Sequence, residues 1–206
     1  MIDASQLLEL YSSGERDFSR VNLTKGNLIE VNLSEIKLWR ANLAEINLSR
    51  AVLRKANLTE CNLVGATLWH TDFKQANLIK AQFSHAMLIR ANLIQSRLQK
   101  SLFVDADLRL ICLEGADLRG ADLSRANLSY ANLRSANLKG ANLNHAVLTG
   151  ACLAQTDLSN TNLEGAILEG ADLSKTILPN VDLGKAKFIS KQVNKIGSNQ
   201  LSKRIL

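Results

Sequence analysis

The stretch ANLSYANLRS at residues 126–135 contains two copies of one pentapeptide, and the pattern continues from it in both directions. A Leu or Phe stands at every fifth position from Phe18 to Phe188, thirty-five times in all, without an insertion or deletion. We call this position the centre and number the other four positions from minus two to plus two. Such strict periodicity is typical of proteins in which each repeat is one structural unit.

The five positions hold different types of residue. The centre is Leu in thirty repeats and Phe in five, position minus two is Ala in twenty, and position minus one is Asn or Asp in twenty-two. In an extended chain, minus two and the centre point to the same side, while minus one points away. A small residue at minus two leaves room for the larger centre in a shared interior. Asn and Asp at minus one are suited to hydrogen-bonding the backbone of a bend.

The odd length of the repeat predicts the architecture. Strict alternation would send every second central Leu into water, so the chain must bend once per repeat. In an α-helix, steps of five residues at about 100° each would spread the central residues around the whole axis. Bends that always turn the same way close into a coil, and coils stack at about 4.8 Å through main-chain hydrogen bonds. The sequence therefore predicts an all-β fold, a β-solenoid with a dry interior.

The repeat resembles the pentapeptide-repeat family over residues 16–190. This resemblance implies a right-handed quadrilateral β-helix with four repeats per coil, and thirty-five repeats would then form about nine coils. One branch of the family consists of acidic, dimeric DNA mimics that protect topoisomerases from quinolones. The net charge of +6 disfavours such gyrase-type mimicry on electrostatic grounds. The Tyr-Ser-Ser-Gly that ends at Gly14, followed by Arg16-Asp17-Phe18, instead resembles a cyanobacterial branch that includes a regulator of heterocyst differentiation acting through protein contacts.

We expect three segments along the chain. Residues 1–15 form an N-terminal capping helix, residues 16–190 form the β-helix of thirty-five repeats, and residues 191–206 form a C-terminal cap or tail. Apolar residues at helical spacing and a capping-box pattern of Asp3 with Gln6 predict a helix over residues 3–12. The tail is rich in Lys and Arg, so short helical turns over the end and a basic flexible arm are both open. Either terminal segment would cover an open sheet edge.

The composition favours a cytoplasmic protein without a membrane partner. There is no signal peptide and no apolar run long enough to span a bilayer. Cys61 falls at an inward position, while Cys112 and Cys152 lie two coils apart on one face, about 10 Å, which is beyond disulfide reach. We therefore expect reduced thiols, as in a reducing compartment.

The sequence does not favour catalysis. The three histidines all fall at outward plus-two positions, outside ligand spacing with any cysteine, so we expect neither a metal site nor a cofactor. Gly115 and Gly120 have the spacing of P-loop glycines, but Ala121 stands where the lysine belongs. The acidic residues are scattered over the outside, with no pair singled out for acid-base chemistry. We predict that the protein is not an enzyme.

Two opposite faces of the expected coil carry candidate binding residues. One has Trp69 and Ile89 at outward positions, and the other has Trp39 and Arg40 among further cations. Trp and Arg are common anchors of protein interfaces. The alternative is that the rings lie flat over neighbouring side chains as partial lids. The predicted partner-binding residues are Trp69, Ile89, Met87, Trp39, Arg40, Leu110 and Tyr130.

Charge is uneven along the chain. Residues 16–100 contain 13 Lys or Arg against 6 acidic residues, and residues 101–190 contain 8 against 10. We interpret the protein as a monomeric, non-enzymatic interaction scaffold, with a regulatory role in view of its resemblance, that presents a rigid outer face to a protein partner. The alternative is a nucleic-acid-associated protein that uses the basic N-terminal half. Interrupting glutamates such as Glu60, and the few aromatic residues for base stacking, disfavour nucleic acid as the partner.

Overall fold

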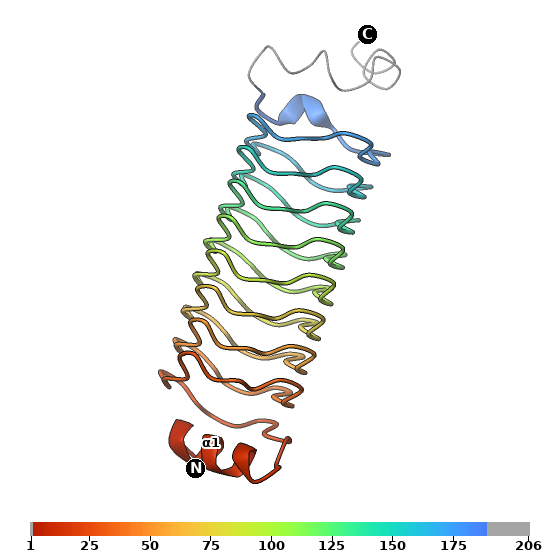
Figure 1. Cartoon of the computed structure of the whole chain (residues 1–206). Helices are drawn as coiled ribbons and strands as arrows, with labels where there is room; N and C mark the ends of the chain where they lie inside the picture. Colours follow the sequence, from red (N-terminus) through yellow and green to blue (C-terminus); the bar gives the residue numbers. More distant parts are fainter. Residues whose placement is uncertain (1, 189–206) are drawn as a thin grey trace.

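The computed structural model describes residues 2–188, which form a rod of stacked coils (Figure 1). Parallel β-bridges join residues that are twenty apart in sequence, from Asp17 with Lys37 to Ile167 with Lys187. Within residues 2–188 the pairing consists of single-residue bridges, with no longer strands. The predicted β-solenoid is therefore present, and the residue through which a pentapeptide bridges to the next coil is its minus-one residue.

Main-chain hydrogen bonds connect each coil to its neighbours. The central N–H of Leu68 donates to the Met87 carbonyl at 2.8 Å, and the plus-two N–H of His70 donates to the Ile89 carbonyl at 3.1 Å. In the other direction, the minus-one N–H of Met87 donates to the Ala66 carbonyl at 2.9 Å. Three of the five backbone donors in a pentapeptide thus pair between coils, which satisfies groups that would be costly to bury unpaired.

The predicted bend is a turn at the plus-two position. This residue has positive φ in every pentapeptide from Arg20 to Asn180, twenty-six times in a residue other than glycine. The left-handed conformation costs about 1–2 kcal/mol for a residue with a Cβ atom. A hydrogen bond closes nearly every turn, as from the Thr71 N–H to the Leu68 carbonyl at 3.2 Å. These turn bonds and the bonds between coils hold the backbone in a conformation that the residue type alone would not favour.

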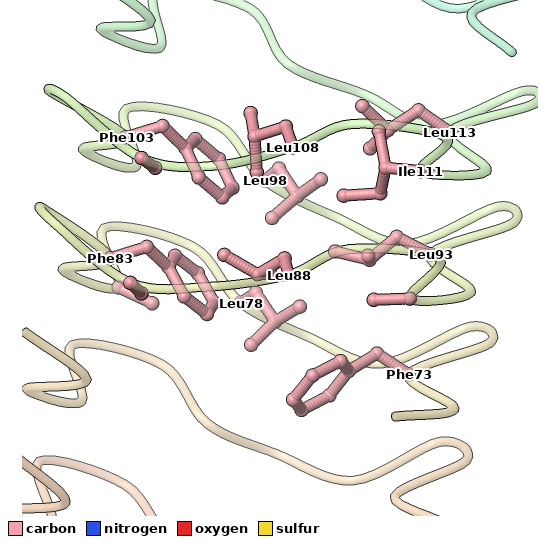
Figure 2. Packing of buried hydrophobic residues seen from close by; sticks show 14 of the residues in the cluster. Phe73, Leu78, Phe83, Leu88, Leu93, Leu98, Phe103, Leu108, Ile111 and Leu113 are labelled. Atoms are coloured by element: carbon pink, nitrogen blue, oxygen red, sulfur yellow. The ribbon is translucent and has the colours of Figure 1, made fainter. Parts of the chain in front are cut away.

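The interior contains the central and minus-two residues, as predicted. Figure 2 shows the side chains in columns, with Phe103 above Phe83 and Leu113 above Leu93. The Phe83 and Phe103 rings stack with centroids 4.7 Å apart and planes inclined by 2°. Buried hydroxyl groups at minus two are also satisfied, as where Thr71 Oγ1 donates to the Leu48 carbonyl at 2.8 Å.

The helix expected over residues 3–12 is present as α1 (Ala4–Ser12). Asp3 is its N-cap and forms a capping box with Gln6, which satisfies two otherwise unpaired backbone donors. Leu7 is fully buried in the cluster that forms the solenoid interior, and the Tyr11 hydroxyl donates to the Ser34 carbonyl at 2.8 Å. The helix lies against the first coil (red in Figure 1).

The last described pentapeptides depart from the regular coil, although the sequence pattern runs on to Phe188. Residues Leu183–Lys185 form the short 3-10 helix η1, and the Asp182 side chain accepts from the Gly184 N–H. The Gly165 N–H donates to the Lys185 carbonyl, twenty residues later in the sequence. The N–H groups at the preceding plus-two positions donate to carbonyls nineteen residues later. The tail expectation for residues 191–206 lies outside the described residues.

Candidate functional site

Most side chains at minus one serve the coil itself. Asn127 Oδ1 accepts from the Ser129 N–H at 3.1 Å and from the Ser129 hydroxyl at 2.6 Å. Between coils, Asn142 Nδ2 donates to Asp122 Oδ1 at 3.0 Å. The predicted role of these residues in hydrogen-bonding the bend is therefore confirmed. Recognition is left largely to the plus-one and plus-two positions.

One face of the rod exposes apolar side chains on four successive coils. Trp69 is 46% exposed and Tyr130 is 64% exposed, while Met87 and Ile89 are half-buried between them. Hydrogen bonds such as that from the His70 N–H to the Ile89 carbonyl place these residues on neighbouring coils. Of the seven large apolar residues that are exposed in the described chain, four lie on this face, since Ile29 also belongs to it. We define the apolar stripe as Trp69, Met87, Ile89, Leu110 and Tyr130.

Tyr130 lies at the end of the apolar stripe and also has a packing role. A Cβ atom added to Gly150, at the same position of the next coil, would lie 2.6 Å from two ring carbons of Tyr130. The ring therefore packs closely against the glycine backbone. His145 and Gly165 repeat this arrangement on another face. The sequence analysis did not identify these pairs, although a glycine twenty residues after an aromatic ring is their signal.

The opposite face carries Trp39, which is half-buried. The Arg20 guanidinium lies 4.8 Å from the centroid of its ring, and that of Arg40 lies 4.5 Å away. Arg40 Nε also lies 2.6 Å from Glu60 Oε2. Trp39 and Arg40 are thus brought together as predicted, but in a stacked arrangement that fits the partial-lid alternative. In contrast, no cation or second ring lies over Trp69 among residues 2–188.

Charged side chains at plus two form ion pairs along the rod. Glu30 pairs with Arg50 at 2.8 Å, and Asp105 pairs with Arg125 through two hydrogen bonds of 2.8 and 2.7 Å. The Arg125 hydrogen bonds lower the pKa of Asp105. The Arg40 hydrogen bond likewise lowers the pKa of Glu60. Exposed pairs of this kind contribute about 0–1 kcal/mol each to stability. The coil is therefore held together mainly by its backbone hydrogen bonds and its interior, and not by these ion pairs.

The thiols have no cysteine partners, since all three cysteines are free. Burial raises the pKa of Cys61 to about 12, and its thiol donates to the Leu38 carbonyl. A buried, protonated thiol is a poor nucleophile and a poor metal ligand. Residues 2–188 contain no group of three or more His, Cys, Asp or Glu that could hold a metal ion.

None of the helices in the described part of the chain is long and apolar enough to cross a bilayer.

The family model for pentapeptide repeats matches the chain in eight copies. The matched residues are 17–54, 32–69, 56–93, 70–103, 87–125, 101–144, 126–165 and 156–190. A search of curated proteins found no match.

Solved structures of pentapeptide-repeat proteins are similar to this chain. Trypsin-treated QnrB1, a plasmid-mediated fluoroquinolone resistance protein, is 17% identical with a TM-score of 0.75, covering 85% of this chain and 92% of QnrB1. At this identity the likeness concerns the fold alone. HetL from Nostoc sp. strain PCC 7120, described as involved in heterocyst differentiation regulation, is 31% identical over 90% of this chain and 97% of HetL, with a TM-score of 0.38. A protein of the Arabidopsis thaliana thylakoid lumen is 36% identical over 50% of this chain and 66% of its own, with a TM-score of 0.37.

Proposed function

The chain belongs to the pentapeptide-repeat family, and from this premise we propose that it is a non-enzymatic scaffold that presents a rigid outer face to a protein partner. The observation that supports the proposal is the apolar stripe, in which side chains from four successive coils are exposed or half-buried on one face. Contiguous exposed apolar surface is characteristic of interaction sites. A side chain as large as Trp69 is costly to leave in water unless a partner covers it.

The coil backbone makes this face suitable for binding. The plus-two N–H donates to the next coil throughout the stripe, as from Leu110 to the Ser129 carbonyl at 3.0 Å. The main chain beneath the stripe is therefore already ordered. Binding then requires little ordering of the main chain, which lowers its entropic cost.

The predicted binding residues differ in how free they are to contact a partner. Trp69, with Ile89 and Met87, has no ring or cation over it and is the first candidate anchor. Leu110 extends the stripe, and Tyr130 contributes the outer side of a ring whose inner side packs on Gly150. Trp39 and Arg40 come second, because they already contact each other.

Several finer features belong to the proposal. We propose a regulatory role, supported by the sequence similarity to HetL. We also propose that the protein is a monomer and that it is located in the cytoplasm; the three free cysteines support this location. We propose a right-handed architecture with about nine coils over residues 16–190. The number of coils is supported by the bridges between residues twenty apart, which correspond to four pentapeptides per coil. Residues 1–15 and 191–206 are proposed as caps for the two open ends, with a basic arm as the alternative for the latter.

Replacement of Trp69 by alanine tests the proposed face. Wild-type protein and the Trp69→Ala variant are immobilised, and proteins retained from a lysate of the source organism are compared by quantitative mass spectrometry. If Trp69 is an interface anchor, its loss costs about 2 kcal/mol of binding free energy, or roughly thirtyfold in affinity. Far-UV circular dichroism checks that the variant is folded.

The matched control is Ile94→Ala, which removes an apolar side chain at the same plus-one position of the pentapeptide, but on another face. Proteins that bind the apolar stripe should be retained by the wild type and by Ile94→Ala and depleted on Trp69→Ala. Equal retention on all three proteins would exclude Trp69 as the anchor.

A further inference from the structure

The positive charge of the first half is concentrated on the face opposite the apolar stripe. The outward positions of this face between residues 16 and 100 carry six cations and two acids, Asp17 and Glu60. They account for +4 of the net +7 in this part of the chain. We define the basic stripe as Arg20, Lys37, Arg40, Lys80, Arg97 and Lys100.

The cations that form no ion pair lie toward the two ends of the basic stripe. In its middle, Glu60 lies 2.6 Å from Arg40 and 3.6 Å from Lys80, so this acid is shared by two cations. Among residues 2–188, the Lys37, Arg97 and Lys100 side chains form no ion pair with any acid. A ligand would thus meet cations without ion pairs at both ends, with Asp17 one coil from Lys37, and cations already paired with Glu60 at the centre.

The centre of the basic stripe is partly apolar. Trp39 and Ile79 are half-buried there at plus-one positions, one coil on either side of Thr59. The distance from Arg20 to Lys100 is four coil steps, about 19 Å at the usual spacing of stacked strands. An extended polypeptide of about six residues spans the same length at roughly 3.3 Å per residue.

We propose that the basic stripe binds an extended acidic segment of a protein, with carboxylates at both ends and uncharged or apolar residues at its centre. Lys37 at one end and Arg97 with Lys100 at the other face the carboxylates, while Trp39 and Ile79 contact the centre. The proposal rests on the scaffold function proposed above but uses a separate face.

Two features favour a polypeptide over a nucleic acid. Every nucleotide carries a phosphate, so a strand along the stripe would place negative charge beside Glu60, whereas a polypeptide can place an uncharged residue there. Single-stranded nucleic acids also require free aromatic faces for base stacking. Trp39 already has two guanidinium groups over its ring, so it offers a poor stacking platform.

The test uses a fluorescein-labelled EELLEE peptide and a labelled thymidine oligonucleotide of about twenty residues, each titrated with full-length protein and followed by fluorescence anisotropy. The stripe variant combines Lys37→Glu, Arg97→Glu and Lys100→Glu. We expect it to bind the peptide at least about tenfold more weakly than the wild type. Wild-type affinity for the peptide should fall as salt rises, because the contacts are exposed charges.

The matched control combines Lys55→Glu, Lys74→Glu and Arg90→Glu. These cations are exposed in the same half of the rod but lie on other faces, and form no ion pair among the described residues. Both variants change the net charge equally. Similar side chains occupy these positions in the native chain: Glu30 and Glu60 at plus two, Glu114 at plus one, and Asp17 and Gln82 at minus one. Circular dichroism confirms folding of both variants, and the control should stay within about threefold of wild-type affinity.

Three outcomes would overturn the proposal. The peptide does not bind the wild type, or both variants lose the same affinity, or the oligonucleotide binds more tightly than the peptide and depends on the basic stripe. Trp69→Ala should bind the peptide as the wild type does, because Trp69 lies on the opposite face. Failure of this inference and failure of the apolar stripe therefore appear in different measurements.

Discussion

The rod has a column of stacked aromatic rings inside, which we call the inner column, and the apolar stripe on its outside. Phe83 and Phe103 stack inside, with no exposed surface, while Trp69 and Tyr130 on the outside are 46% and 64% exposed. Position within the pentapeptide decides the difference, because only minus two and the centre point into the coil. Apolar residues at plus one and plus two therefore contribute little to the interior and are available for recognition.

The largest effect that would sharpen this comparison is expected in the inner column. Phe83→Ala removes a fully buried ring between two coils and should lower the free energy of unfolding by about 3–5 kcal/mol. Trp69→Ala removes a larger ring but should cost no more than about 1 kcal/mol, since nearly half of that side chain is already in water. Urea denaturation followed by far-UV circular dichroism measures both. Equal losses would mean that Trp69 is part of the structural core and that the comparison fails.

An intermediate effect is expected where an outer ring contacts the backbone. Gly140 and Gly150 have positive φ values of 67° and 65°, but only at Gly150 would a Cβ atom meet a ring, that of Tyr130. Gly140→Ala should cost about 1 kcal/mol from the left-handed conformation alone. Gly150→Ala should cost more, because the methyl group must displace the Tyr130 ring.

The Tyr130→Ala background provides the control for this pair of substitutions. There the extra cost of Gly150→Ala should disappear, leaving the cost seen at Gly140. Thermal unfolding of the single and double variants measures the coupling. If the extra cost persists without the Tyr130 ring, packing of this outer residue on the next coil is not its cause.

The smallest effect is expected in the outer ion pairs. Arg125 holds the pKa of Asp105 below its ordinary value of 3.8, so Asp105 contributes stability above that pH and loses it as the pH falls through its folded pKa. Below pH 4, the wild type should therefore lose slightly more stability than Asp105→Asn or Arg125→Met. Unfolding midpoints between about pH 2 and pH 6 measure this difference. Unchanged pH dependence in both variants would contradict a role for the pair in stability.

Most of the solenoid could be predicted because each pentapeptide repeats the same local information. The alternation of buried and exposed positions, the bend and the bonding of minus-one Asn and Asp all follow from five residues at a time. The α1 helix was predictable for a similar reason, since the capping box of Asp3 and Gln6 is local. The start of η1 at Leu183 was not predictable. Leu183 still fits the repeat as a central residue, and only the contacts at the end of the coil distinguish it from the other central residues.

The candidate site was predictable only in part. The sequence placed Trp39 and Trp69 at outward positions, but it could not tell that two guanidinium groups lie over Trp39 while Trp69 is uncovered. Those contacts come from residues one coil away or beside the ring, and their geometry depends on how the coils stack.

The amino-acid sequence by itself determined which side chains face the interior, because an odd repeat with a small residue beside most central Leu or Phe residues must bend once per repeat to keep them dry. Only the tertiary structure decided which outer side chains are covered and which are free. That outcome depends on pairs twenty residues apart, such as Tyr130 over Gly150, which meet only when one coil stacks on the next.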